Sequence, residues 1–195
     1  MTARVLLGVA AWLLLALLAG ASGSLAGLRP PFPQAVLAGL TLALLALFRW
    51  SPPVRTWVLT VDIRALVLVH VTRFVGLYFL VLHARGLLPW VFAVPGGWGD
   101  IAVATAALGV ALGVPRRGAA GWAIYAAWNL AGLADILLVV TAATRLGVAE
   151  PGSMRALTVL PLSLLPTFLV PVVIATHVVI WARLAASRRA GYRAL

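Results

Sequence analysis

Six long apolar runs, separated by short connections rich in Pro, Gly and Arg, constrain the fold of this chain more than any other feature. Crossing a bilayer as a helix takes about 20 apolar residues. Lipid offers an unpaired backbone no hydrogen bonds, so such runs fold as helices. The pattern predicts an all-α integral membrane bundle of about six transmembrane helices, one domain over residues 1–195. The runs cover roughly residues 5–22, 34–49, 58–84, 100–115, 119–144 and 156–182.

The composition fits lipid rather than water as the environment. Hydrophobic residues make up 64% of the chain and charged residues 10%, whereas about a quarter of the residues in soluble domains are charged. The chain has no Cys, which excludes disulfides and thiolate metal sites, and no Lys, which excludes a Schiff-base cofactor. The net charge of +11 comes from arginines that flank the apolar runs. We interpret them as topology signals rather than as a nucleic-acid surface.

The arginines also predict the orientation, because positively charged loops stay on the cytoplasmic side. If both termini are cytoplasmic, ten arginines lie inside and four outside. The inside set is Arg4, Arg49, Arg55, Arg64, Arg116, Arg117, Arg183, Arg188, Arg189 and Arg193, and the outside set is Arg29, Arg85, Arg145 and Arg155.

The first run has a second interpretation. Arg4, the apolar core and the small residues of "LLAGASGSLAG" also match a secretory signal peptide. We favour an uncleaved first helix because the apolar run is long for a signal core. Cleavage would leave five helices with the C-terminus still inside.

Ionisable residues inside lipid-spanning helices are costly and mark functional sites by default. Arg73 stays charged there, so it needs an anion or water. Counting depth at about 1.5 Å per residue places Asp135 and Asn129 near it. The sequence therefore predicts a buried polar network of Arg73, Asn129 and Asp135. Such a network is either a structural clip between helices or a proton or anion site.

Two histidines fall at the same depth, with His70 about 8 Å and His177 about 9 Å above the inner boundary. They could meet as axial ligands of haem b, as metal ligands or as members of a proton relay. Two neutral, packed histidines are the alternative. We expect no haem and no other cofactor, because "LVLVHVTRF" and "VVIATHVVIW" crowd both histidines with branched and aromatic side chains.

The stretch "LPWVFAVPGGWGD", residues 88–100, combines apolar residues with helix breakers. Asp100 follows Pro95 and three glycines, the position of an N-cap whose carboxylate accepts backbone N–H groups. The preceding "PWVFAV" is too short to span and predicts a re-entrant or interfacial segment between helices 3 and 4. Such a hairpin could form the floor of an outer cavity, with His83 and Asp100 at its rim.

The sixth run contains Pro161, Pro166 and Pro171. Each interior proline removes a backbone hydrogen bond, so the helix must be kinked or broken, with freed carbonyls bonded to hydroxyls or water. Broken helices line cavities in many membrane proteins. A packing distortion without a cavity is equally compatible with the sequence.

The run "RFVGLYFLVLHARGLLPWVFAVPGGWGD", followed by "WNLAGLAD" and "LLPTFLVPVVIATHVVIW", resembles a group of uncharacterised small bacterial multi-pass inner-membrane proteins. The resemblance covers Arg73 to His177. It implies a location in the bacterial inner membrane and a common helical fold, and it implies no activity.

Two classes of function remain open. A small-solute or ion binding or transport protein fits the broken sixth helix, the glycine-rich hairpin and the polar network. A haem b electron-transfer protein would use His70 and His177. No hydrolase serine motif, metal triad or acidic cluster is visible, so the sequence does not predict an enzyme. We expect the lipid bilayer and a small solute or ion as partners, and no nucleic acid; assembly into a homo-oligomer is left open.

Overall fold

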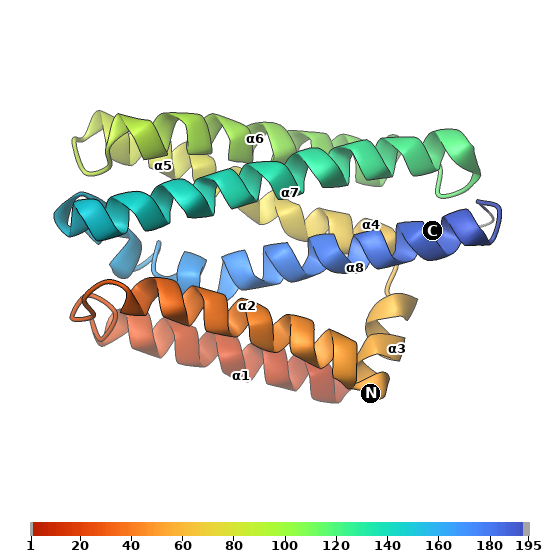
Figure 1. Ribbon diagram of the computed structural model, residues 1–195, viewed down its shortest axis with the longest axis horizontal. Coiled ribbons are helices and arrows are strands. Elements are labelled where there is room, and N and C mark those ends of the chain that lie inside the picture. The colour runs from red at the N-terminus through yellow and green to blue at the C-terminus, as the bar shows by residue number, and fades with distance from the viewer. Residues whose placement is uncertain (1, 193–195) are drawn as a thin grey trace.

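The computed structural model describes residues 2–192, and every regular element among them is helical. Their order along the chain fixes the labels used below and in Figure 1. The elements are α1 (Thr2–Ala21), α2 (Phe32–Trp50), α3 (Pro52–Thr60), α4 (Ile63–Leu68), η1 (Val69–Val75), α5 (Gly76–Ala84), α6 (Trp90–Gly113), α7 (Gly118–Ala149), η2 (Pro151–Thr158), η3 (Leu165–Leu169) and α8 (Val170–Arg189).

Six stretches are long and apolar enough to cross a membrane. The third is built from α4, η1 and α5 in succession, and the sixth from η3 and α8. The predicted all-α bundle with six membrane-spanning helices is confirmed. The spans are Ala3–Ala21, Phe32–Trp50, Ile63–Ala84, Trp90–Gly113, Gly118–Ala149 and Leu165–Arg189.

The spans run up and down the bundle, so the connections gather at two ends (Figure 1). One end carries α3 and the turn between α6 and α7, with most of the arginines. We call it the arginine-rich end. The other holds the connections 22–31, 85–89 and 150–164, and we call it the arginine-poor end.

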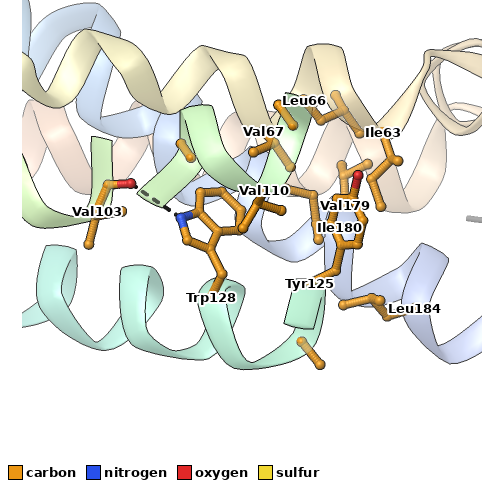
Figure 2. Packing of buried hydrophobic residues seen from close by; sticks show 13 residues of the cluster. Ile63, Leu66, Val67, Val103, Val110, Tyr125, Trp128, Val179, Ile180 and Leu184 are labelled. Atoms are coloured by element: carbon orange, nitrogen blue, oxygen red, sulfur yellow. Dashed lines mark hydrogen bonds between the residues drawn. The ribbon is translucent and has the colours of Figure 1, made fainter. Parts of the chain in front are cut away.

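Four spans form the core, namely α4–η1–α5, α6, α7 and α8, which we call the four-span core. Its half next to the arginine-rich end is filled by a cluster of apolar side chains around Tyr125 and Trp128 (Figure 2). Trp128 Nε1 donates to the Val103 carbonyl at 3.2 Å, which joins α7 to α6. This half of the bundle is therefore solidly packed.

The helices α1 and α2 lie along one edge of the bundle (Figure 1). α2 packs against α8 and η3, and α1 contacts η3. Only 11% of the most apolar 18-residue stretch of α1 and 6% of that of α2 are buried, against 33% to 50% for the other spans. Both peripheral helices therefore keep most of their apolar surface free for lipid.

The fourth span begins ten residues earlier than predicted. α6 starts at Trp90 and runs through Pro95 and the glycines that follow, so the predicted re-entrant segment between helices 3 and 4 is wrong. Membrane helices tolerate Pro and use Gly to bring backbones together. A Cβ on Gly97 would lie 2.9 Å from the Gly76 carbonyl oxygen, so these glycines allow α5 and α6 to touch through their backbones.

The sixth span is broken, as its prolines predicted. A single π-helical turn, η3, precedes α8, and Pro171 lacks the N–H that would bond to the Thr167 carbonyl. Trp12 Nε1 of α1 donates to that carbonyl at 2.9 Å. The Thr167 hydroxyl in turn donates to the Ser163 carbonyl at 2.7 Å. Side chains thus satisfy backbone groups at the break.

Candidate functional site

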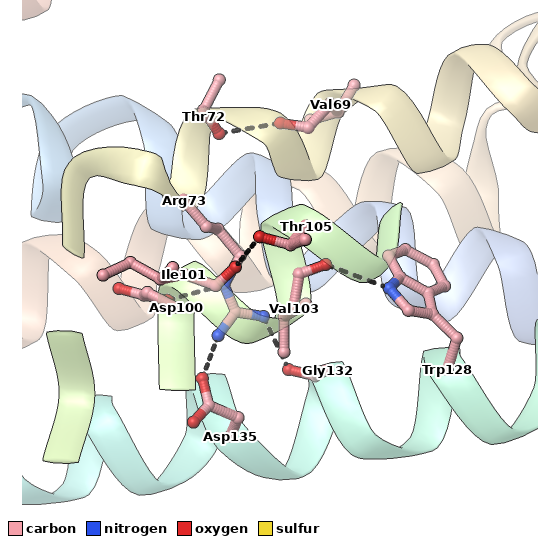
Figure 3. Close-up of polar contacts among 10 residues, drawn as sticks. All are labelled: Val69, Thr72, Arg73, Asp100, Ile101, Val103, Thr105, Trp128, Gly132 and Asp135. Atoms are coloured by element: carbon pink, nitrogen blue, oxygen red, sulfur yellow. Dashed lines mark hydrogen bonds and ion pairs between the residues drawn. The ribbon is translucent and has the colours of Figure 1, made fainter. Parts of the chain in front are cut away.

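Arg73 lies at the centre of the four-span core, and its side chain is 3% exposed (Figure 3). Its guanidinium bonds to three groups on two other helices. Nε donates to Asp100 Oδ1 of α6 at 2.6 Å, and Nη1 donates to the Gly132 carbonyl of α7 at 2.9 Å. Nη2 donates to the carboxylate of Asp135, also on α7. One cation therefore ties three spans together through two carboxylates.

Glycine makes this arrangement sterically possible. A Cβ on Gly99 of α6 would overlap an oxygen of Asp135, so the carboxylate occupies space that any other residue would fill. A Cβ on Gly132 would lie 2.8 Å from Cε1 of His177. Small residues at helix contacts let backbones and polar groups approach closely in membranes. Here Gly99 and Gly132 allow the Arg73 site and His177 to lie on two sides of the same turn of α7.

Of the two partners predicted for Arg73, the structure brings Asp135 to it and places Asn129 elsewhere. Asn129 is fully buried and pairs with His177 of α8. His177 Nδ1 donates to Asn129 Oδ1 at 2.7 Å, because an amide oxygen only accepts. Asn129 Nδ2 donates to the His177 carbonyl at 3.2 Å. The predicted trio is therefore split into two neighbouring pairs, since Asn129 lies six residues, or about 1.7 turns of helix, before Asp135.

Asp100 takes the place predicted for Asn129. The prediction that it caps a helix at the rim of an outer cavity is wrong, because it lies in the middle of α6 and only 3% of it is exposed. The N-cap role belongs to Asp62, which accepts from the backbone N–H of Arg64 at 2.9 Å. Periodicity could have found Asp100 had residues 90–113 been taken as one helix, because it shares a face with Val103 and Ala107.

His70 and His177 do meet, as their equal depth suggested. Both are fully buried, and their ring centroids are 4.2 Å apart. His70 Nε2 lies 3.2 Å from the Thr176 hydroxyl, and the rings of His70 and Trp128 are perpendicular, with centroids 5.0 Å apart. The two rings are in direct contact, so an iron and its porphyrin could enter between them only by forcing them apart. No group of three or more metal-binding side chains occurs within residues 2–192.

His83 lies at the arginine-poor end, where its Nδ1 is 3.1 Å from the Leu88 carbonyl. A surface cavity of about 570 Å³ is found at this end, between the connection after α5 and the segment around η2. Neither His83 nor Asp100 lines it. The two residues predicted to share a rim therefore do not share a site.

A second cavity, of about 350 Å³, extends from the arginine-poor end to the Arg73 site. We call it the central cavity. Its walls are almost entirely apolar and come from α2 and the connection before it, η1, α5, α6, α7, η2, η3 and α8, while Arg73 and Asp100 supply its charged lining. Gln34 of α2 also lines it, and the Gln34 side-chain oxygen is buried without a hydrogen-bond partner among the described residues. In the sequence, the broken sixth span is the only feature that indicates this cavity.

The model of one protein family, described as "Domain of unknown function (DUF8737)", matches residues 30–185. The chain belongs to this family. No curated protein and no solved structure matches the chain.

The DUF8737 match covers the polar groups of the site. It includes the Arg73 site, the histidine pair and every lining residue of the central cavity except Leu28, and it begins after α1. The family model therefore describes the chain from the start of α2 to near the end of α8.

Proposed function

We propose that this DUF8737 protein binds a small, mostly apolar solute in the central cavity, as a binding or transport protein of the membrane. The observation that carries the proposal is an apolar cavity ending on a buried ion pair. Ligand pockets of about 300 to 1,000 Å³ with apolar walls and a few polar groups are typical of small-molecule sites. At about 350 Å³, the central cavity is at the lower end of this range.

The lining indicates how the solute would be oriented. The apolar walls would take its body, and its polar group would face Asp100 and Arg73 at one end. Arg73 uses one N–H of each terminal nitrogen in the bonds described above, which leaves a second N–H on each. The oxygen of Gln34 offers a further acceptor. A solute with a single hydrogen-bonding head and a short apolar tail fits this distribution.

We further propose that the protein lies in a bacterial inner membrane with its arginine-rich end in the cytoplasm. The ten-to-four arginine bias supports this orientation, although Arg193 lies outside the described residues. The central cavity would then be reached from the extracytoplasmic side. Reporter fusions in the connection 85–89 and after α8 test the orientation, and a cytoplasmic signal from that connection would contradict it.

Solute binding is tested by filling the cavity. Ala143 of α7 lines it, so Ala143→Trp should occupy the space of the solute. Decanol, decylamine and decanoate share an apolar tail and differ in the polar head. Each is added to protein in lipid nanodiscs, and the thermal unfolding midpoint is measured. A ligand at 100 times its Kd stabilises the folded state by about 2.7 kcal/mol, so at least one compound should raise the wild-type midpoint.

The matched control is Ala131→Trp, which adds the same side chain to an exposed position of α7. It should respond to the compounds as the wild type does, whereas Ala143→Trp should not respond. An equal rise in all three proteins would show that the compounds act through the lipid. That result, or no rise in any protein, would contradict solute binding in the central cavity.

A further inference from the structure

The Arg73 site contains an unequal number of positive and negative groups. Arg73 keeps its proton in proteins, so it supplies one positive charge. Asp100 and Asp135 would supply two negative charges if both were ionised. The exposed fractions of the Arg73, Asp100 and Asp135 side chains are 3%, 4% and 22%. An uncompensated charge at this depth costs several kcal/mol.

No other cation is in a position to balance the site within residues 2–192. The remaining arginines lie at or near the ends of the spans. The ionisable neighbours are His70 on η1 and His177 on α8. His177 donates through Nδ1. Among the described residues, neither its Nε2 nor Nδ1 of His70 has a hydrogen-bond partner. A cationic imidazole must donate from both nitrogens, so the contacts fit two neutral rings.

The two carboxyl groups can balance the charge of the site themselves, because one of them can bind a proton. Both bond to one guanidinium, so they converge on the same point from α6 and α7. A protonated carboxyl still accepts through its carbonyl oxygen. One added proton therefore neutralises the site and leaves every bond to Arg73 in place.

We propose that Asp100 and Asp135 share one exchangeable proton, so that the site consists of one guanidinium, one carboxylate and one carboxylic acid. Loss of the proton leaves one net negative charge, which a cationic group in the central cavity could replace, because Asp100 lines that cavity. The site thus binds either a proton or a cation. This inference needs no solute in the cavity, so it can fail or succeed independently of the proposed function.

Infrared spectroscopy can test the proton count directly, because the chain has only four acidic side chains. They are Asp62, Asp100, Asp135 and Glu150. The full chain is measured at neutral pH in a detergent without carbonyl groups. We expect a C=O stretching band of a protonated carboxyl that shifts in D₂O. Neither Asp62 nor Glu150 should contribute, because Asp62 is half exposed beside Arg116 and Glu150 is exposed.

Sharing makes a specific prediction for the single variants. In Asp100→Asn, the remaining Asp135 is balanced by Arg73 and should be ionised, so the band should disappear. In Asp135→Asn, the same reasoning applies to Asp100, and the band should disappear again. The matched controls Asp62→Asn and Glu150→Gln should keep it.

Two results would overturn the proposal. A wild-type spectrum without the band would show that no carboxyl is protonated. A band that survives in either Asp100→Asn or Asp135→Asn would show that a single carboxyl is protonated by its surroundings alone, without sharing. The wild-type spectrum is decisive even if a variant fails to fold, and thermal unfolding of each variant identifies that case.

Discussion

The four-span core and the peripheral helices α1 and α2 are all apolar enough to span a membrane, yet they are attached in different ways. In the core, side chains bond across helices at depth, through Arg73 with the carboxyl groups of Asp100 and Asp135 and through Asn129 with His177. Among the described residues, α1 is joined to the core by one such bond, from Trp12. Lipid is as apolar as the helices, so burial alone does not hold them together. Polar bonds and glycine contacts give the core its specific packing.

The largest effect on stability is expected from removing the charge of Arg73 at the centre of the four-span core. Arg73→Met leaves the buried Asp100 and the partly buried Asp135 without their cation, and breaking a buried pair costs about 3 to 5 kcal/mol. We expect a loss of that size in the free energy of unfolding, measured by steric trapping in bicelles. The exposed Arg55 is the control. Arg55→Met should change stability by less than about 0.5 kcal/mol, and equal losses would refute the special role of Arg73.

A smaller effect is expected at the second polar pair. Asn129→Leu leaves the buried Nδ1–H of His177 without an acceptor, which costs about 1 to 3 kcal/mol. Replacing both partners by apolar residues can be nearly neutral. The double variant Asn129→Leu with His177→Leu should therefore be more stable than the sum of the single losses indicates. Strict additivity in this double-mutant cycle would mean that the pair is not energetically coupled.

The smallest effect should arise where α1 meets the core. Trp12→Phe removes the donor to the Thr167 carbonyl, and one such hydrogen bond contributes about 0.5 to 1.5 kcal/mol. Trp50 is exposed, so Trp50→Phe is the matched control. The ratio of the losses in the free energy of unfolding in Trp12→Phe and Arg73→Met measures how differently polar bonds hold α1 and the four-span core. A Trp12 loss as large as that of Arg73 would remove the distinction between them.

Sequence reasoning succeeded where one physical constraint dominates. Long apolar runs fix the number of spans, and a permanently charged Arg73 in lipid has few acidic residues to choose from, which led to Asp135. The predictions were wrong where a residue type affects a helix differently in water and in a membrane. Pro95 and the glycines after it end helices in water, but inside a membrane they allow α6 to continue and to touch α5. Asp100 was therefore assigned to a helix start.

Depth along a helix was predicted better than direction around it. Asn129 and Arg73 were placed at similar levels, but the contact between Asn129 and His177 depends on how α7 and α8 are rotated against each other. Sequence spacing within one helix does not contain that information. The central cavity was missed for the same reason, because its walls come from eight helical elements whose relative rotations only the structure gives.

The 3₁₀ winding of η1 sets the directions in which the third span points its polar side chains. Residues three apart project the same way in a 3₁₀-helix, so His70 and Arg73 emerge on one side of the span. Three residues of α-helix turn only about 300°. Rewinding η1 as an α-helix would thus rotate Arg73 about 60° relative to His70 and shorten seven residues by roughly 3 Å. Such a change in the pitch of η1 would therefore separate the contacts of Arg73 with the carboxyl groups from the contacts of His70, while α4 and α5 stay folded.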